Sequence, residues 1–189
     1  MEISQTLRSS GLAAALLALS ACGGGAKFRP VSDVPVRIGP PYTVRGITYT
    51  PRADSAYDRV GYATWYGPES GNRTANGERF QPDWVSAAHT TLPLPTYVEV
   101  TDLDTGRRII VRVNDRGPFS GRGRIIDLSR GAAKELGVLR KGVAPVRVRA
   151  AEPSDKDRRR LREGKSAKPL DPVPERDLRR LRERLAAGG

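Results

Sequence analysis

Apolar and polar residues alternate along several short stretches between residues 60 and 150, as in β-strands that have one buried face. Glycine, proline and asparagine separate these stretches and indicate turns. The pattern predicts six strands, at residues 60–66, 84–88, 97–103, 107–114, 124–128 and 145–150. Many short strands in so few residues indicate a small closed barrel, although composition alone does not distinguish a barrel from a sandwich.

One helix is expected between the last two strands. Ser129 is a suitable N-cap, residues 132–136 favour a helix, and Gly137 is a good C-terminal stop. The chain therefore reads as mainly β, with a single short helix.

The first 21 residues resemble an export signal. Arg8 precedes an apolar run at residues 11–19, which is too short to span a bilayer, and Leu-Ser-Ala comes directly before Cys22. This pattern resembles a bacterial lipoprotein signal, in which Cys22 would be acylated after cleavage. Each buried methylene of the acyl chains would contribute roughly 0.8 kcal/mol to anchoring. The alternative is an ordinary secretory signal with an incidental cysteine.

Composition changes on both sides of the expected barrel at residues 59–150. Residues 22–58 are rich in glycine and proline and predict a flexible, lipidated tether, with a short strand at 41–49. Residues 151–189 are basic. Three leucines (Leu178, Leu181 and Leu185) recur there at helical spacing, which indicates either an amphipathic helix or a solvated, disordered tail.

The formal charge of +12 is spread along the chain rather than gathered in one patch. An exported chain would not meet nucleic acid, so anionic envelope polymers or lipid headgroups are the expected counterparts of this charge. The single cysteine and single histidine allow no disulfide and are too few for a zinc site of the His/Cys type, which leaves carboxylate-rich calcium sites as the alternative. We expect no metal and no cofactor.

A polar cluster follows the strand at residues 107–114. Asn114, Asp115 and Arg116 sit where this strand ends, before the turn at Gly117. A carboxyl, an amide and a guanidinium at a strand end suit the binding or protonation of a polar ligand, although a capped turn would look the same. Arg116 would lower the pKa of Asp115 if the two were close, but strand alternation directs it to the other face.

Two further clusters add candidate groups. Trp65 and Tyr66 are adjacent aromatic residues that could stack on a sugar ring or belong to the core. Glu78 leaves a tight turn that begins at Thr74, and His89 follows eleven residues later. Alone, each is commonly a structural residue. Together with Asp115, they would supply an acid, a base and an orienting group.

These motifs resemble the rare lipoprotein A (RlpA) family in order and spacing. They are Trp65-Tyr-Gly67, Thr74-Ala-Asn-Gly-Glu78, Ala87-Ala-His89, Asn114-Asp-Arg-Gly-Pro-Phe119 and Ile125-Ile-Asp-Leu-Ser129. The resemblance covers about residues 59–150 and implies a six-stranded double-psi β-barrel. It also implies lytic transglycosylase activity on peptidoglycan, cleaving between N-acetylmuramic acid and N-acetylglucosamine with 1,6-anhydromuramyl products.

The resemblance places the functional positions of the family on Glu78, His89 and Asp115. A lytic transglycosylase needs one carboxyl that first protonates the leaving oxygen and then acts as a base, and we assign this role to Asp115. Glu78 would share the proton or stabilise positive charge, His89 would hold a carboxyl or a sugar hydroxyl, and Asp127 would be structural. The expected substrate-binding residues are Trp65, Tyr66, Thr74, Asn114 and Arg116.

The expected partners are peptidoglycan glycan strands, the membrane through Cys22, and an envelope or division protein through the basic tail. By family analogy, Gly23 after Cys22 favours an outer-membrane address facing the periplasm. No SPOR domain follows the barrel in this sequence, which puts septal targeting and a preference for denuded glycan in doubt. The alternative function is non-catalytic peptidoglycan binding of the expansin type.

Overall fold

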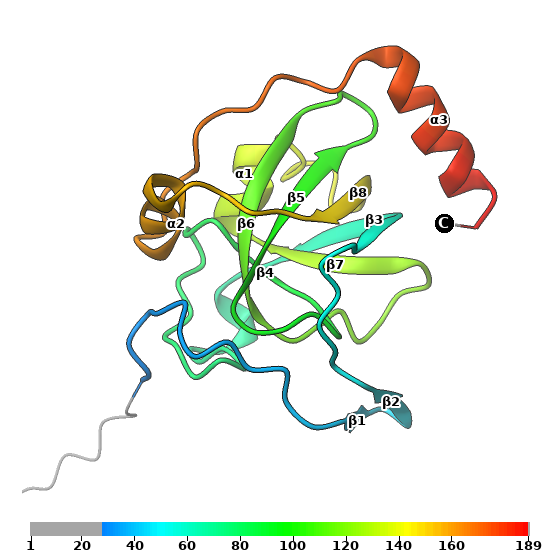
Figure 1. The fold of residues 1–189 in the computed structure, drawn as a ribbon. Helices are drawn as coiled ribbons and strands as arrows, with labels where there is room; N and C mark the ends of the chain where they lie inside the picture. Colours follow the sequence, from blue (N-terminus) through cyan, green and yellow to red (C-terminus); the bar gives the residue numbers. More distant parts are fainter. Residues whose placement is uncertain (1–27, 189) are drawn as a thin grey trace, which may run out of the picture.

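A computed structural model describes residues 28–188, so the expected signal peptide and Cys22 lie outside the described residues. Its centre is a barrel of six strands (Figure 1). These strands are β3 (Asp58–Tyr66), β4 (Ser86–Ala88), β5 (Thr96–Asp102), β6 (Arg108–Asp115), β7 (Arg124–Ser129) and β8 (Ala144–Ala150). Each overlaps one of the six predicted strands, because the alternation of apolar residues reflects one face turned into the barrel.

The barrel closes in the order β3-β7-β4-β6-β5-β8. Two neighbouring pairs, β3 with β7 and β4 with β6, run parallel, and the other four pairs are antiparallel. The inward-facing side chains form one core of small and branched residues, among them Val98, Val111, Val113, Ile126 and Val146. Strand order therefore brings β4, β6 and β7 side by side although they are distant in sequence.

The predicted helix is confirmed as α1 (Arg130–Leu136). Ser129 accepts a hydrogen bond from the backbone N–H of Ala132, and Gly137 ends the helix in the left-handed conformation at φ 87°. The Ser129 hydroxyl also donates to the carbonyl oxygen of Trp84 at 2.5 Å, which ties the helix start to the approach to β4. The residues of α1 that enter the core are Ala132, Ala133 and Leu136.

The sequence predicts a free tether up to residue 58, whereas residues 28–57 lie along the barrel. The backbone of Arg37 pairs with that of Leu94, and the Tyr42 hydroxyl donates to the Thr90 carbonyl oxygen at 2.7 Å. A small hairpin of β1 (Tyr42–Val44) and β2 (Ile47–Tyr49) projects beside the barrel (Figure 1). This segment is held to the barrel by backbone and side-chain hydrogen bonds, while several of its apolar side chains, among them Val34 and Val36, are exposed.

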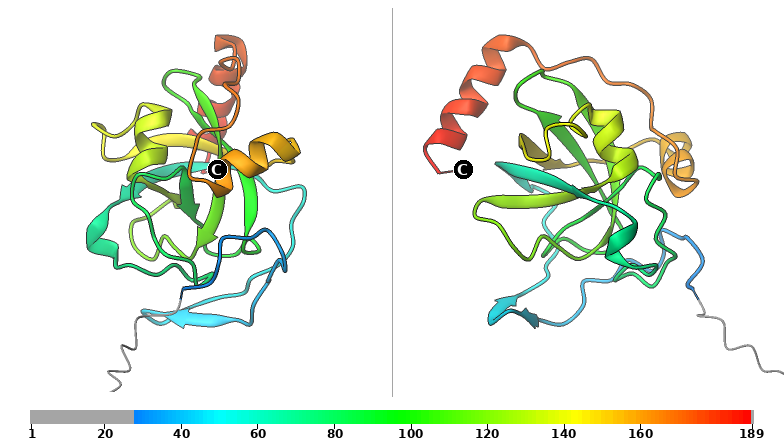
Figure 2. Two further views of the ribbon diagram at one scale, coloured as in Figure 1. Left: turned by 90° about the vertical axis from the view of Figure 1, so that its left-hand side faces the viewer. Right: turned by 180° about the vertical axis from the view of Figure 1, so that it is seen from behind.

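The basic tail contains two helices, α2 (Asp155–Arg162) and α3 (Glu175–Ala186). An extended strap at residues 163–174 joins them across the outside of the barrel (Figure 2). The helical alternative for the leucine-bearing segment is confirmed. Its leucines are buried because Val60 and Leu103 on the barrel form a second apolar cluster with Leu178 and Leu181. Within residues 28–188, no helix is long and apolar enough to cross a membrane.

Candidate active site

The carboxylate of Asp115 lies at the rim of the barrel, at the end of β6. Its Oδ1 accepts hydrogen bonds from the backbone N–H groups of Ala75, at 2.7 Å, and Arg116, at 2.8 Å. Burial raises the pKa of Asp115 above its ordinary value, although these two N–H donors and the Arg116 charge oppose the rise. The residue is half-buried, and its carboxyl holds its proton more tightly than a solvated one.

The guanidinium of Arg116 is directed away from Asp115. It donates to the carbonyl oxygens of His89 at 3.1 Å, Leu92 at 2.5 Å and Ile38 at 3.1 Å. It also lies 5.9 Å from the ring centroid of Tyr42. Arg116 therefore fastens the N-terminal segment and the loop after β4 to the barrel, and this engagement explains why its charge does not dominate the pKa of Asp115.

A second carboxylate, that of Asp127, stands on the other side of β4. Ala88 of β4 is in register with Asp115 on β6 and with Asp127 on β7. Since adjacent strands are about 4.8 Å apart, the two aspartate backbones are about 10 Å from each other. Asp127 accepts from the Thr64 hydroxyl at 2.7 Å and from Arg124 at 2.5 Å. Two acidic residues therefore flank Ala88, which carries the smallest of side chains.

Gly117 packs beside Ala88 and Asp127. A Cβ atom at this position would lie 3.6 Å from both the Ala88 Cβ and Oδ2 of Asp127, and the glycine has φ of +146°. A side chain there would be strained by the backbone conformation and would fill the space beside Asp127. The Asn-Asp-Arg-Gly-Pro-Phe turn thus passes close to Ala88 and Asp127.

Tyr66 belongs to the same cluster. Its ring stacks on Phe80 with centroids 5.0 Å apart, and its hydroxyl is buried without a hydrogen-bond partner among residues 28–188. Burial, followed by the charges of Asp115 and Asp127, raises the pKa of this phenol well above its ordinary value. The hydroxyl therefore remains protonated at neutral pH.

Glu78 is buried and fully bonded. Arg112 donates to both of its oxygens, at 2.7 and 2.8 Å, and the side-chain amides of Asn76 and Asn114 each donate at 2.9 Å. The exposed fractions of the Glu78 and Arg112 side chains are 1% and 3%. The structure thus places Glu78 behind the site, where it fixes the asparagines that border Asp115. No acceptor position is left for exchanging a proton with a ligand.

Thr74 is buried inside the turn that leads to Glu78. Its hydroxyl accepts from the Glu78 N–H at 3.2 Å and donates to the Glu78 carbonyl oxygen at 3.3 Å. This placement differs from the expected substrate contact. The hydroxyl is used to close the turn that presents Ala75 to Asp115.

His89 is also buried, and its ring is occupied by protein groups. Its Nδ1 accepts from the N–H groups of Thr91 and Leu92, at 3.2 and 3.1 Å, so Nε2 carries the proton and donates to the Tyr57 hydroxyl at 2.9 Å. Burial lowers the pKa of His89 to about 3, with a further lowering from the Arg116 charge. The ring is thus neutral and shapes the loop whose carbonyl oxygens hold Arg116. It does not meet the carboxyl of Asp115.

Trp65 does not join the site. It alternates with Tyr66 along β3, packs against the main core, and its indole N–H donates to the Leu139 carbonyl oxygen at 3.1 Å. An aromatic cluster that the sequence reasoning missed lies instead beside the turn at Gly117. Tyr42 stacks on Tyr49 with centroids 5.4 Å apart, and Phe119 contacts both rings at 6.0 and 5.6 Å. These three rings are half-exposed.

A cavity of about 330 Å³ adjoins this cluster. Tyr42, Pro40 and Arg37 of the N-terminal segment line it on one side, and Ala75 and Asn76 line it on the other. The residue next to this lining, Asp115, is bonded directly to Ala75. The N-terminal segment, which the sequence suggested to be a tether, therefore forms one wall of the candidate site.

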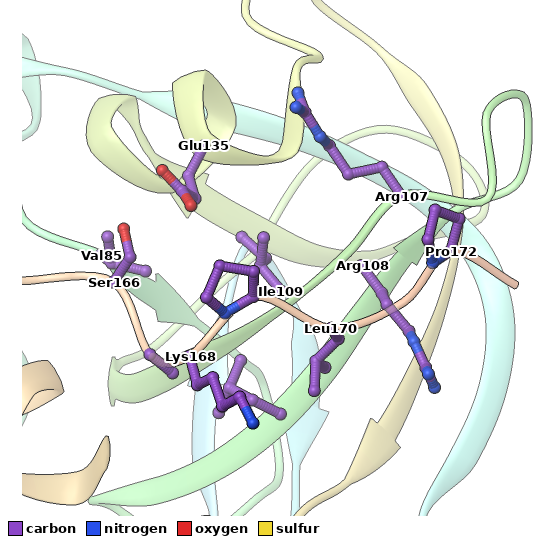
Figure 3. A pocket seen from close by; sticks show the side chains of 12 residues that line it. Val85, Arg107, Arg108, Ile109, Glu135, Ser166, Lys168, Leu170 and Pro172 are labelled. Carbon is purple, nitrogen blue, oxygen red and sulfur yellow. The ribbon is translucent and has the colours of Figure 1, made fainter. Parts of the chain in front are cut away.

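A separate cavity of about 310 Å³ lies under the strap, away from these carboxylates. Figure 3 shows it between Glu135 of α1, Arg108 and Ile109 of β6, and Lys168 and Leu170 of the strap. Its lining mixes both signs of charge with apolar side chains, and it contains none of the groups described above. Among residues 28–188, no cluster of three histidine, cysteine or carboxylate side chains could hold a metal ion.

Comparison with known proteins points to one family. Residues 58–148 match the lytic transglycolase family. A Pseudomonas aeruginosa (strain UCBPP-PA14) protein named endolytic peptidoglycan transglycosylase RlpA is 55% identical over 115 residues, or 60% of this chain and 33% of that protein. A Campylobacter jejuni protein of the same name is 47% identical over 110 residues, or 57% of this chain and 40% of its own length. The chain thus spans well under half of these two relatives.

Similar solved structures are more distant. A Streptomyces papain inhibitor is 24% identical and covers 53% of this chain and 100% of its own, with a TM-score of 0.44. An expansin from Clavibacter michiganensis is 20% identical and covers 51% of each chain, with a TM-score of 0.39. The family match and the closed six-stranded order confirm the predicted double-psi β-barrel.

Proposed function

We propose that the protein cleaves peptidoglycan glycan strands as an endolytic transglycosylase, because residues 58–148 match the lytic transglycolase family. The observation that carries the proposal is the environment of Asp115. This carboxyl is half-buried at a rim, its pKa is raised, and the adjacent Arg116 is turned away from it. A carboxyl that acts as a general acid near neutral pH requires these conditions.

The reaction follows from one carboxyl acting twice. The protonated Asp115 donates its proton to the glycosidic oxygen, which leaves on the N-acetylglucosamine side as a hydroxyl while positive charge develops at C1 of N-acetylmuramic acid. The 6-hydroxyl of the same muramyl residue attacks C1, and the Asp115 carboxylate takes the proton of that hydroxyl. The products are a free 4-hydroxyl and a 1,6-anhydro ring, and Asp115 is protonated again.

The neighbouring groups support this reaction in distinct ways. Asp127 is held by Thr64 and Arg124, and as a carboxylate it would stabilise the positive charge that forms at C1. The rings of Tyr42, Tyr49 and Phe119 offer apolar faces for the sugars on either side of the cleaved bond.

Product analysis tests the proposal. The purified protein is incubated with intact sacculi and with sacculi stripped of stem peptides, and the soluble products are separated and weighed by mass spectrometry. We expect muropeptides or glycan fragments that end in 1,6-anhydromuramic acid. Products with a reducing end would indicate hydrolysis instead. Binding to sacculi without any release would indicate a glycan-binding module.

We also propose that Cys22 anchors the protein by acylation on the periplasmic side of the envelope, at the outer membrane. The proposal rests on the residues before Cys22 and on its place as the one cysteine of the sequence. Metabolic labelling with radioactive palmitate should mark the wild type and leave a Cys22→Ser variant unlabelled. Label retained in that variant would refute acylation at this position.

An envelope protein that binds the tail would meet arginines rather than leucines, because Leu178 and Leu181 are already buried against the barrel. The exposed residues of α3 include Arg176, Arg179 and Arg180. A partner would therefore carry an acidic surface. Substituting these arginines should weaken capture of such a partner without loss of glycan cleavage.

A further inference from the structure

Three segments of the chain meet behind the site, around the carboxylate of Asp33. Asp33 lies in the N-terminal segment and accepts from Nε of Arg112 on β6 at 3.1 Å. It also accepts from the guanidinium of Arg162, the last residue of α2, and from the Tyr97 hydroxyl at 2.9 Å. Asp33 thus joins the chain before the barrel, the barrel, and the chain after it.

Arg112 is held on every side by this arrangement. Its Nε donates to Asp33, its Nη2 donates to the Ser32 carbonyl oxygen at 2.8 Å, and both of its Nη atoms donate to Glu78. A planar guanidinium engaged along two edges cannot rotate without breaking several charged hydrogen bonds. The segments outside the barrel therefore determine the direction in which Arg112 presents itself to Glu78.

Glu78 connects Arg112 to the residues next to the candidate acid. It fixes the side-chain amides of Asn76 and Asn114, and the Asn76 N–H donates to the Asn114 carbonyl oxygen at 3.2 Å. The neighbouring Ala75 N–H is the donor to Asp115 at 2.7 Å. Hydrogen bonds therefore run from Arg162 through Asp33, Arg112 and Glu78 to Asn76 and Asn114, which are the sequence neighbours of Ala75 and Asp115.

The charges of this set balance. Arg112 and Arg162 supply two positive charges, and Asp33 and Glu78 supply two negative charges. Removing Arg162 would leave an excess negative charge next to a buried guanidinium, and removing Asp33 would leave an excess positive charge. Either loss would disturb the arrangement, because buried charges reorganise when a neutralising partner is lost.

We propose that Asp33 and Arg162 are positioning residues for Asp115, so that the two segments flanking the barrel complete the site. This inference rests on the proposed transglycosylase function, since Asp115 is its acid. Neither residue is hydrogen-bonded to Asp115 itself. Their effect would be to hold the Ala75 N–H, and with it the carboxyl of Asp115, in the orientation that protonates the glycosidic oxygen.

The docking of α2 does not depend on Arg162 alone, which makes the inference testable without unfolding the helix. Leu161 is buried in the main core, and Arg158 lies 4.9 Å from the ring centroid of Tyr97. The turn after the helix is fixed as well. Gly164 has φ of +77°, and a Cβ atom there would lie 2.2 Å from the Trp84 ring. A variant at Arg162 should therefore keep the helix in place.

The experiment compares Arg162→Gln with Arg159→Gln in the full chain, with kcat and KM measured on peptidoglycan. Arg159 is an exposed arginine of the same helix, so the two variants lose the same charge. We expect kcat to fall by about three- to thirtyfold in Arg162→Gln alone, with KM and the melting temperature little changed. Arg162→Lys should recover part of the loss. The double variant with Asp33→Asn should lose less than the sum of the single effects on log kcat.

Equal kcat in the Arg162→Gln and Arg159→Gln proteins would overturn the inference, as would additive effects of Asp33→Asn and Arg162→Gln. Amide spectra by NMR give a second measurement that does not depend on activity. The signals of Ala75 and of the Asn76 and Asn114 side chains should shift in Arg162→Gln but not in Arg159→Gln. Unshifted signals would refute the positioning role even if the wild type proved not to be a transglycosylase. An inactive wild type with shifted signals would refute the proposed function alone.

Discussion

Arg116 follows Asp115 directly in the chain, yet its guanidinium donates to carbonyl oxygens of other segments and leaves the Asp115 carboxylate to two backbone N–H groups. The strand ends between these residues, so the two side chains leave the backbone in different directions. Burial can then raise the pKa of Asp115 although a cation is adjacent in sequence. This separation makes an acid role for Asp115 chemically reasonable.

Replacing Asp115 by asparagine should abolish release of anhydromuramyl products, because an amide cannot donate the proton that the leaving oxygen needs. The melting temperature should stay within a few degrees of the wild type, since asparagine can still accept from Ala75. Mass spectrometry of the products and a thermal unfolding curve measure the two effects. Asp83→Asn, at an aspartate with 73% of its side chain exposed, is the control and should remain active. Activity retained in Asp115→Asn would exclude it as the acid.

The fall of kcat/KM at high pH should reflect deprotonation of Asp115. The acid is active while protonated, so kcat/KM falls as pH rises through its pKa, and a raised pKa extends activity to higher pH. The Arg116 charge lowers this pKa. Arg116→Gln should therefore shift this fall to higher pH, whereas Arg122→Gln, at an exposed arginine, should not. A shift to lower pH would contradict this electrostatic assignment.

Glu78→Ala should destabilise the fold much more than Asp115→Asn. The substitution leaves the buried guanidinium of Arg112 without its main partner and removes the acceptor for two asparagine amides. Breaking a buried ion pair in this way costs about 3–5 kcal/mol of unfolding free energy. Urea denaturation measures the loss. If Glu78→Ala keeps wild-type stability but loses all activity, Glu78 takes part in the chemistry directly.

His89 should make stability depend on pH above the range in which most carboxylates titrate. Its pKa is lowered to about 3 in the fold, while the unfolded chain takes up the proton near its ordinary value of 6.5. The unfolded state therefore binds more protons between these values, and the free energy of unfolding falls as pH falls, by up to about 1.4 kcal/mol per pH unit. Urea denaturation is measured at several pH values from 6.5 to 5. The free energy of unfolding should depend less steeply on pH in His89→Gln than in the wild type. Equal slopes would mean that His89 does not titrate with unfolding.

Tyr42→Ala and Phe119→Ala should weaken binding to sacculi. Each removes a half-exposed ring from the aromatic cluster beside the turn at Gly117, and an aromatic contact of this kind contributes about 0.5–1.5 kcal/mol, or roughly two- to tenfold in affinity. Sedimentation with sacculi measures the change. Tyr62→Ala is the matched control, because Tyr62 is an exposed tyrosine on β3 outside this cluster. An equal loss in all three variants would indicate nonspecific adhesion.

Local patterns in the sequence predict the strands and the first helix well. Alternation defines β6, and Ser129 with Gly137 defines the bounds of α1, because each signal acts within a few residues. The sequence motifs also lead to Asp115. They cannot show that Asp127 stands across Ala88 from Asp115, because this depends on the order of strands in the closed barrel.

The roles of buried polar residues are equally dependent on distant partners. Glu78 looks like an exposed charge after a turn, and only its contact with Arg112, 34 residues away, makes it a buried anchor. His89 looks like a base until Tyr57 and two N–H groups occupy its ring. Sequence spacing points to residues that gather in one region, and tertiary contacts separate the candidate acid from the buried residues around it.

The second apolar cluster, beneath α3, has a practical consequence for experiments that delete the tail. Val60 and Leu103 are shielded from water by Leu178 and Leu181. A protein truncated after the last barrel strand would therefore expose an apolar surface and tend to self-associate. Poor recovery or low activity of such a truncated protein would report aggregation, so point substitutions on the outer arginines are the sounder way to ask what the tail does in the cell.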